Sequence, residues 1–369
     1  MAGGNWEYEM KRSIKIGVTA LFVPGMLVLG AVTGLFLAAM PWLTGLTAAL
    51  AVLAFLALGA AAGALGVCAF CGGMALALWL LEPGLLALAP WFGLFLGLAL
   101  ALICGQLHAG VSAGRAMVFT GAGLFAFGAV SYIAGNLITG DLIARVTDML
   151  SAELAQMREL MPQLYDLLLS MLSLNGMLPD VELTQPMTEL DAQTRAVLTA
   201  SLIELYDSSL RLGLMQILMQ QALHTAFLGV LLPLFVLNGN LKASAMPLPD
   251  LTAARIPAKP ATFIMLALIV SWVWMLFDTS AYAAYLAVWS AVKFVYAVQG
   301  LSLAEWFMKK HGWAGVLRAL VLCAAYLILQ DILLLLGVAE QFFDFRRLAK
   351  APRLFGDDSD KDHNDHDLY

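Results

Sequence analysis

The chain has 369 residues, of which 61% are hydrophobic and only 12% are charged, and its formal net charge is −6 at pH 7. Because a soluble globular domain is typically about 25% charged, this composition excludes an ordinary soluble protein and predicts one that lies in a membrane. The lipid bilayer is therefore the first partner expected, and no nucleic-acid partner is expected.

The N-terminus predicts an uncleaved first membrane helix. Residues 1–16 carry Lys11, Arg12 and Lys15 and precede an apolar run from Gly17 to Met40. The apolar region of a signal peptide has only about 7–15 residues. Because this run is longer, we interpret residues 1–16 as a cytoplasmic N-terminus and the run as a helix that stays in the membrane.

The fold class predicted by hydropathy is all-α: a polytopic bundle of transmembrane helices. Each crossing needs about 20 mainly apolar residues, and the chain holds about nine such stretches, with eight crossings as the alternative. They form an N-terminal block of about five helices, residues 17–138, and a C-terminal block of about four, residues 213–338. The predicted helices are 17–39, 42–62, 64–82, 86–105, 116–136, 213–237, 262–278, 280–304 and 316–338.

Residues 139–212 separate the two blocks and are strongly acidic. Between 139 and 210 there are 11 acidic residues against three arginines, and apolar residues recur at helical spacing. We therefore expect an acidic helical hairpin that projects from the membrane on the extracytoplasmic side.

Lys and Arg in short loops mark the cytoplasmic side of a membrane protein. They gather in the N-terminus, in loop 238–261 and in loop 305–318. Nine crossings with the N-terminus inside place all three on the cytoplasmic face, but also send Arg346 and Arg347 outside. Either the orientation fails at this point or one helix does not cross, so the side of the C-terminus stays open.

Residues 339–356 are predicted to anchor the last helix at the membrane interface. Aromatic rings are favoured there, and arginines can contact phospholipid headgroups. An aspartate between the rings can hold a neighbouring arginine. The predicted anchor residues are Phe343, Asp344, Phe345, Arg346 and Arg347. The acidic segment that follows, residues 357–369, is predicted to be disordered.

Ionisable residues inside membrane helices cost about 2.5–3.5 kcal/mol each and are candidates for function. Lys293 and Asp331 lie in neighbouring predicted helices at similar depth, so they could pair, as a substrate or proton site or as a structural clamp. Gln220 and His224 share one face of another helix, which lines a cavity or bonds across helices. Gln220, His224, Lys293 and Asp331 are the predicted substrate-binding residues.

Glycines at GxxxG spacing, such as Gly30 and Gly34, let membrane helices approach closely. They predict tight packing within the bundle or a docking face for a partner membrane protein. The motifs of nucleotide-binding loops, zinc proteases and serine hydrolases are missing from the sequence. We therefore expect no enzyme, no catalytic residue, no cofactor and no metal site.

The stretches "VQGLSLAEWFMKKHG" and "LLLLGVAEQFFDFRRL" resemble the C-terminal pattern of the YybS-like family, bacterial membrane proteins that share domain of unknown function 2232. The matching positions are Gly300, Leu336-Gly337 and the run Phe343–Arg347, within a likeness over about residues 12–350. Glu340 departs from the family's spacing. The resemblance implies a multi-pass protein of the bacterial cytoplasmic (inner) membrane.

The same resemblance implies a distant fold-level likeness to the substrate-binding subunits of energy-coupling-factor transporters and to a cell-shape scaffold. Two functions follow. The first is a membrane-embedded small-molecule binding or transport component. The alternative is a membrane scaffold that docks partner membrane proteins in cell-envelope processes. A polar cavity inside the bundle favours the first, and a solid bundle favours the second.

Overall fold

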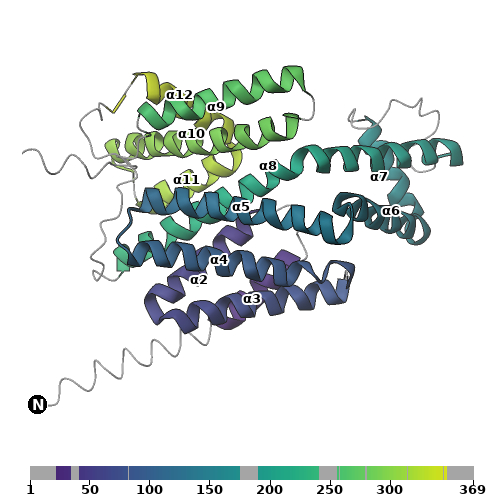
Figure 1. The fold of residues 1–369 in the computed structure, drawn as a ribbon, viewed down its shortest axis with the longest axis horizontal. Coiled ribbons are helices and arrows are strands. Elements are labelled where there is room, and N and C mark those ends of the chain that lie inside the picture. Colours follow the sequence, from purple (N-terminus) through teal and green to yellow (C-terminus); the bar gives the residue numbers. More distant parts are fainter. Residues whose placement is uncertain are drawn as a thin grey trace, which may run out of the picture. The chain divides into compact units, whose positions relative to one another are not determined.

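The computed structural model describes residues 22–34, 41–81, 83–174, 190–240, 256, 258–278, 281–313, 315–343 and 345–346. All regular structure in these ranges is helical (Figure 1), as the sequence predicts. By length and composition, 5 helices are able to cross a membrane: Ala60–Leu80, Leu88–His108, Ala113–Ile138, Ala192–Leu234 and Tyr282–Lys310. The predicted N-terminal segment 1–16 and acidic tail 357–369 lie outside the described ranges.

The N-terminal block of the structure is a series of helices. Helix Phe22–Gly34 is followed by α2 (Pro41–Leu58), α3 (Ala60–Leu81), the 3-10 turn η1 (Pro83–Leu85), α4 (Leu88–His108) and α5 (Ala113–Thr139). Gly59 separates α2 from α3 with φ of +106°, a conformation that costs little only for glycine. The boundary predicted near residue 63 therefore lies at Gly59.

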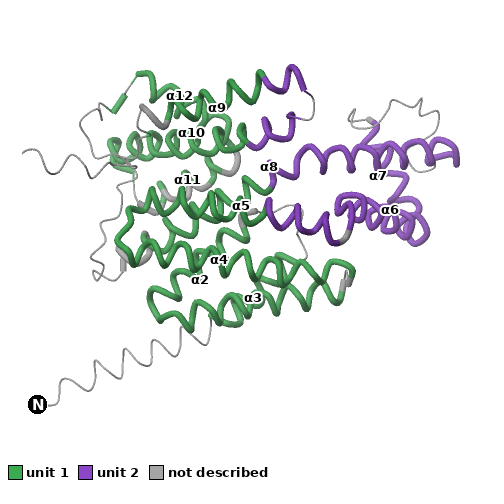
Figure 2. Tube along the Cα trace, in the orientation of Figure 1, with its two compact units in different colours: residues 1–128, 218–273, 288–369 green, residues 129–217, 274–287 purple. Residues whose placement is uncertain are grey.

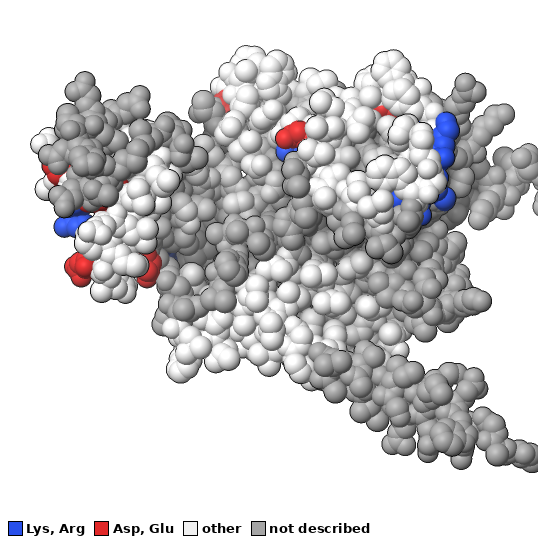
Figure 3. All heavy atoms as spheres, turned by 180° about the vertical axis from the view of Figure 1, so that it is seen from behind, with Lys and Arg blue, Asp and Glu red and all other residues white. Residues whose placement is uncertain are grey.

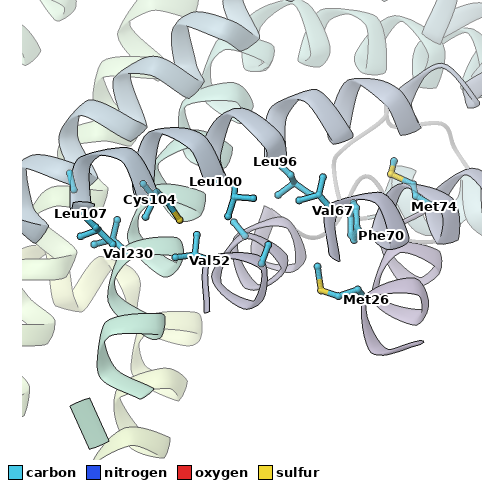
Figure 4. Close-up of a cluster of buried hydrophobic side chains, with 14 of the residues drawn as sticks. Met26, Val52, Val67, Phe70, Met74, Leu96, Leu100, Cys104, Leu107 and Val230 are labelled. Atoms are coloured by element: carbon cyan, nitrogen blue, oxygen red, sulfur yellow. The ribbon is translucent and has the colours of Figure 1, made fainter. Parts of the chain in front are cut away.

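Small residues hold the first helix against α3. A Cβ atom on Gly30 would lie 2.0 Å from the carbonyl oxygen of Phe70, and one on Gly73 would lie 1.9 Å from that of Leu27. Figure 4 shows Met26, Phe70 and neighbouring apolar side chains packed in the same cluster. These glycines thus serve packing within the chain, the first of the two roles that their spacing predicts.

Two compact units make up the chain (Figure 2). Unit 1 contains residues 1–128, 218–273 and 288–369, and unit 2 contains residues 129–217 and 274–287. Unit 2 includes the acidic insertion, with α6 (Leu142–Leu160), α7 (Pro162–Leu174) and the first part of α8 (Ala192–Asn240). The stretch interpreted as one helix of a hairpin is two helices, because Pro162 cannot continue α6 but is well suited to begin α7.

A buried ion pair stabilises unit 2. The side chain of Asp166 is 3% exposed, and its Oδ1 atom accepts a hydrogen bond of 2.6 Å from Nε of Arg195. The other carboxylate oxygen accepts from the backbone N–H of Leu190 at 3.2 Å. The Arg195 hydrogen bond, helped by that of Leu190, lowers the pKa of Asp166 below its usual value although burial acts against this.

The C-terminal helices of the structure are α9 (Ala258–Phe277), α10 (Tyr282–Lys310), α11 (Gly315–Ile328) and α12 (Gln330–Phe343). The prediction of one crossing helix over 316–338 is wrong, because the helix is interrupted at Leu329. The chain reverses its direction there.

Three contacts show that α12 runs parallel to α10: Lys293 with Asp331, Gln299 with Gln341, and Ser302 with Arg346. Residue numbers increase together along both helices. Since α11 starts just beyond the end of α10 and brings Tyr326 back to the level of Phe294, it runs against α10. We call α11 and α12 the C-terminal hairpin, with its tip at Leu329, and both helices are labelled in Figure 1.

Two glycines bring α12 against α10. A Cβ atom on Gly300 would lie 1.9 Å from the carbonyl oxygen of Leu333, and one on Gly337 would lie 1.9 Å from that of Tyr296. Backbone therefore touches backbone at both positions, where no side chain fits. This contact fixes the direction of α12 and the position of the hairpin tip beside the middle of α10.

Replacing Asp166 with Asn is expected to destabilise unit 2 by about 2–3 kcal/mol. This is less than the ~3–5 kcal/mol for a fully buried pair, because Arg195 keeps 24% exposure. Since the folded pKa of Asp166 is lowered, its contribution is full above the ordinary carboxyl pKa of about 3.9 and is lost as the pH falls through the folded value. Thermal unfolding at several pH values measures this, with the exposed Glu153→Gln as control. Equal losses in both variants would refute the prediction.

Gly300→Ala and Gly337→Ala are each expected to lower the stability of the protein in detergent by about 1–3 kcal/mol or more, because the added methyl group overlaps a backbone carbonyl. Gly97→Ala is the matched control, since nothing lies within 4 Å of its Cβ position, and it is expected to be neutral or stabilising. Thermal denaturation of the three purified variants provides the comparison. Unchanged melting of the Gly300 and Gly337 variants would show that α12 does not pack on α10 in this way.

Candidate functional site

Lys293 and Asp331 meet beside the tip of the C-terminal hairpin. Nζ of Lys293 lies 2.6 Å from Oδ1 of Asp331, so the expected pairing is present. The side chain of Asp331 is 78% exposed and that of Lys293 is 25% exposed. Asp331 also lies in the first turn of α12, where a negative charge is stabilised by the helix dipole. The pair thus places one accessible carboxylate at the point where the chain reverses.

Gln220 and His224 lie in the interior of unit 1, on α8. Nδ1 of His224 lies 2.6 Å from the backbone carbonyl oxygen of Gln220, and Nε2 lies 3.1 Å from the hydroxyl of Tyr326 on α11. The Gln220 side chain donates to Oγ of Ser290 on α10 at 3.5 Å. These contacts bond α8 to its neighbours, which is one of the two roles the sequence predicts for the polar stripe.

A hydrogen-bonded chain leads from α8 to the hairpin tip. Tyr326 hydrogen-bonds His224 on one side and the side chain of Gln330 on the other. Gln330 is the first residue of α12 and precedes Asp331. The four predicted residues therefore belong to one polar region, in which His224 is buried, Gln220 is partly buried, and Lys293 and Asp331 form the accessible part.

Sequence reasoning missed Tyr326, Gln330 and Ser290. Tyr326 and Gln330 are four residues apart and would share a face of the single helix predicted over 316–338, so this spacing beside Asp331 was the available signal. Ser290 lies three residues before Lys293 and carried no signal of its own.

The outer end of the hairpin is fixed by a second ion pair. Nε of Arg346 donates to Oε1 of Glu340 at 2.9 Å, and both side chains are 0% exposed. Arg346 also donates to Oγ of Ser302 at 2.6 Å, and the backbone N–H of Phe345 donates to Glu340. Glu340 therefore holds the guanidinium of Arg346 inside the protein, where it does not face headgroups as predicted. The predicted pairing with Asp344 falls on a residue outside the described ranges and stays a prediction.

The remaining anchor residues fall into two groups. Phe343 and Phe345 are 72% and 53% exposed, so their location at the membrane interface stays a prediction. Asp344 and Arg347 lie outside the described residues. Among the described residues, charge is sparse on the face shown in Figure 3, where most coloured or white surface is uncharged and the charged atoms form a few small groups.

Gln299 of α10 bonds to α12 and to Ile256, which precedes α9, near the outer end of the hairpin. It is 2% exposed, accepts from the backbone N–H of Ile256 at 3.2 Å, and donates to the carbonyl oxygen of Gly337 at 3.0 Å. The segment before α9, α10 and α12 are thereby held together on one side of the bundle.

Comparisons with protein-family models, with curated proteins and with solved structures find no match. The resemblance to the YybS-like family therefore stays a prediction.

Arg346→Ala is expected to cost about 3–5 kcal/mol of stability, because it leaves the Glu340 carboxylate buried without its partner. The double replacement Glu340→Leu with Arg346→Met removes both charges and is expected to recover most of that loss. Arg211→Ala is the control: this arginine is 44% exposed in its ion pairs, so a small effect is expected. The melting temperatures of the variants in detergent test this prediction. An Arg346→Ala variant that melts like the wild type would show that the pair is not buried.

Proposed function

We propose that this chain is an integral membrane protein that binds or transports a small molecule at the tip of the C-terminal hairpin. The observation that carries the proposal is the accessible Lys293–Asp331 pair at the point where α11 and α12 reverse. In the same proposal the protein is a multi-pass component of the bacterial cytoplasmic membrane.

The length of the two hairpin helices supports a position inside the bilayer. Each has 14 residues, or about 21 Å at 1.5 Å per residue, whereas the hydrocarbon core is about 30 Å thick. Neither arm is long enough to cross alone, so the hairpin would enter from one side and return to it. Re-entrant backbone of this kind is found where it is buried in protein or lines a water-filled cavity.

A re-entrant hairpin also removes the conflict in the distribution of basic residues. If α11 and α12 do not cross, eight helices cross instead of nine. The basic residues after α12, among them Arg347, Lys350 and Arg353, would then lie on the same side as loop 305–318. The orientation with the N-terminus inside becomes consistent with the positive charges at both ends of the chain.

The charges at the tip support binding. A charged side chain in hydrocarbon is unfavourable by ~2.5–3.5 kcal/mol on insertion scales, and Asp331 is 78% exposed although it lies on a hairpin of apolar helices. Water or a polar ligand at this surface would relieve that cost. Interrupted helices near the middle of the membrane form the substrate sites of many secondary transporters.

The alternative function, a scaffold for partner membrane proteins, draws less support from the geometry. Two of the small-residue faces that suggested it are used inside the chain: Gly30 and Gly34 lie against α3, and the Cβ position of Gly63 meets Ala51 and Phe55 of α2. A docking role would need a different surface.

Native mass spectrometry of the full chain, purified in mild detergent, tests the binding proposal. The wild type is expected to retain a small polar molecule, and Lys293→Ala and Asp331→Ala are each expected to lose it, because each removes one charge of the site. Arg211→Ala, which breaks an ion pair of unit 2, is expected to keep it.

The exchange variant Lys293→Asp with Asp331→Lys separates binding from a clamp. It preserves an ion pair, so a purely structural pair would regain the wild-type melting temperature. A wild type without any bound molecule, together with single variants whose only defect is a lower melting temperature that the exchange repairs, would overturn the proposal.

A further inference from the structure

We infer that His224 is a proton-binding site that controls the tip of the C-terminal hairpin, so that protonation of its imidazole changes the state of the Lys293–Asp331 pair. The inference rests on the proposed function, because it assigns the proton as the regulating ligand of the same site. It is carried by the hydrogen-bonded chain from His224 through Tyr326 to Gln330.

The acceptor on α8 determines which imidazole nitrogen carries the proton. The backbone carbonyl of Gln220 only accepts, so Nδ1 of His224 must be the donor in their bond of 2.6 Å. In neutral imidazole Nε2 is then the acceptor, and the hydroxyl of Tyr326 donates to it. The Tyr326 oxygen can at the same time accept from the side-chain amide of Gln330. Each hydrogen bond between Gln330, Tyr326, His224 and Gln220 therefore has a defined donor and acceptor.

A proton taken from water onto Nε2 reverses that direction. Nε2–H becomes a donor, so the Tyr326 oxygen must accept from it and the tyrosine proton must turn to another acceptor. Gln330 satisfies this if its amide turns and presents the carbonyl oxygen. Because Gln330 opens α12 next to Asp331, the rearrangement ends at the ion pair. The proton returns to water when the pH rises, and no other bond is made or broken.

His224 lies among buried groups that disfavour a positive charge on its imidazole. The imidazole is 5% exposed and meets the ring of Phe294 edge-on, and α2 packs on its backbone through Gly45. An imidazolium held among such groups is unfavourable without a counter-charge. Of the acidic residues on α10 and α12, Asp331 lies at the hairpin tip, whereas Glu305 and Glu340 lie towards the C-terminal ends of the two helices. Protonation would therefore favour hairpin positions in which the Asp331 carboxylate or water comes closer.

Several ionisable side chains lie on the helices around His224. Tyr326 of α11 faces it directly, and Lys293 of α10 precedes Phe294 and is paired with Asp331 of α12. On the same helices, Glu305, Arg318 and Glu340 lie at least two helical turns along the chain from Phe294, Tyr326 and Asp331 respectively. The sequence of α2 contains no ionisable side chain. Helix α5 packs on α8 through Gly121, and its ionisable residues, Arg115 and Tyr132, lie more than one helical turn from that contact.

Hydrogen–deuterium exchange of the full chain, corrected for intrinsic rates and measured between pH 4 and pH 8, tests the inference. Peptides that cover residues 322–340 are expected to change their protection several-fold across one transition below the pH typical of an exposed histidine, because burial disfavours the charged imidazole. His224→Gln retains an amide that donates and accepts but does not titrate, so its protection is expected to be independent of pH. Tyr326→Phe is expected to lose the transition too, because it removes the relay and leaves the histidine in place.

His311→Gln is the matched control. His311 also bonds the carbonyl four residues before it, with Nδ1 2.8 Å from the oxygen of Phe307, but it is exposed at the end of α10. This variant is expected to keep the transition. A wild type without a transition, or one that persists in His224→Gln, would overturn the inference, and Tyr326→Phe gives the same decision if His224→Gln does not fold.

The outcome separates this inference from the proposed function. A bound molecule that depends on Lys293 and Asp331, in a protein whose hairpin does not respond to pH, leaves the binding function intact and removes the proton site. A pH transition that needs His224 and Tyr326, in a protein that holds no small molecule, keeps the proton site and removes the binding function.

Discussion

The contact between α10 and α12 across Gly300 and Gly337 is the constraint on which the C-terminal half depends. Each glycine leaves room for a carbonyl oxygen of the other helix, 1.9 Å from where a Cβ atom would lie. In lipid, where apolar side chains gain little from leaving one apolar surface for another, such close packing is a main source of helix association. It aligns α12 parallel to α10, and this alignment brings Asp331 to Lys293 and Arg346 to Ser302.

The two ion pairs of α12 have opposite environments. At the outer end, Glu340 and Arg346 are fully covered, and three hydrogen bonds satisfy them. Such a pair tolerates no loss of one partner and holds the end of the helix in place. At the tip, Asp331 remains accessible and only Lys293 contacts it among the described ion pairs. A fixed base with an accessible charged tip is suited to a ligand site, because the base positions charges that the ligand can still reach.

The buried polar groups of α8 connect this tip to the rest of unit 1. His224 lies against Tyr326, and Tyr326 against Gln330. In a low-dielectric interior, hydrogen bonds of this kind are strong and their donors and acceptors must match. A change of protonation at one end is therefore transmitted as a change of hydrogen-bond direction.

The amino-acid sequence was enough to predict a helical membrane protein, because a segment that lies in lipid must be apolar and long enough to cross it, and both properties can be read from composition. It also indicated Lys293 and Asp331, since charges in apolar helices are conspicuous. The break at Leu329 within the run 316–338 could be seen only in the tertiary structure, because the sequence has no proline or glycine at that residue to predict a helix end. The partner of Arg346 was hidden for the same reason: Glu340 reaches it only because the chain turns back after α12. Hydropathy records how much of a segment avoids water, whereas direction and pairing depend on which backbone it packs against.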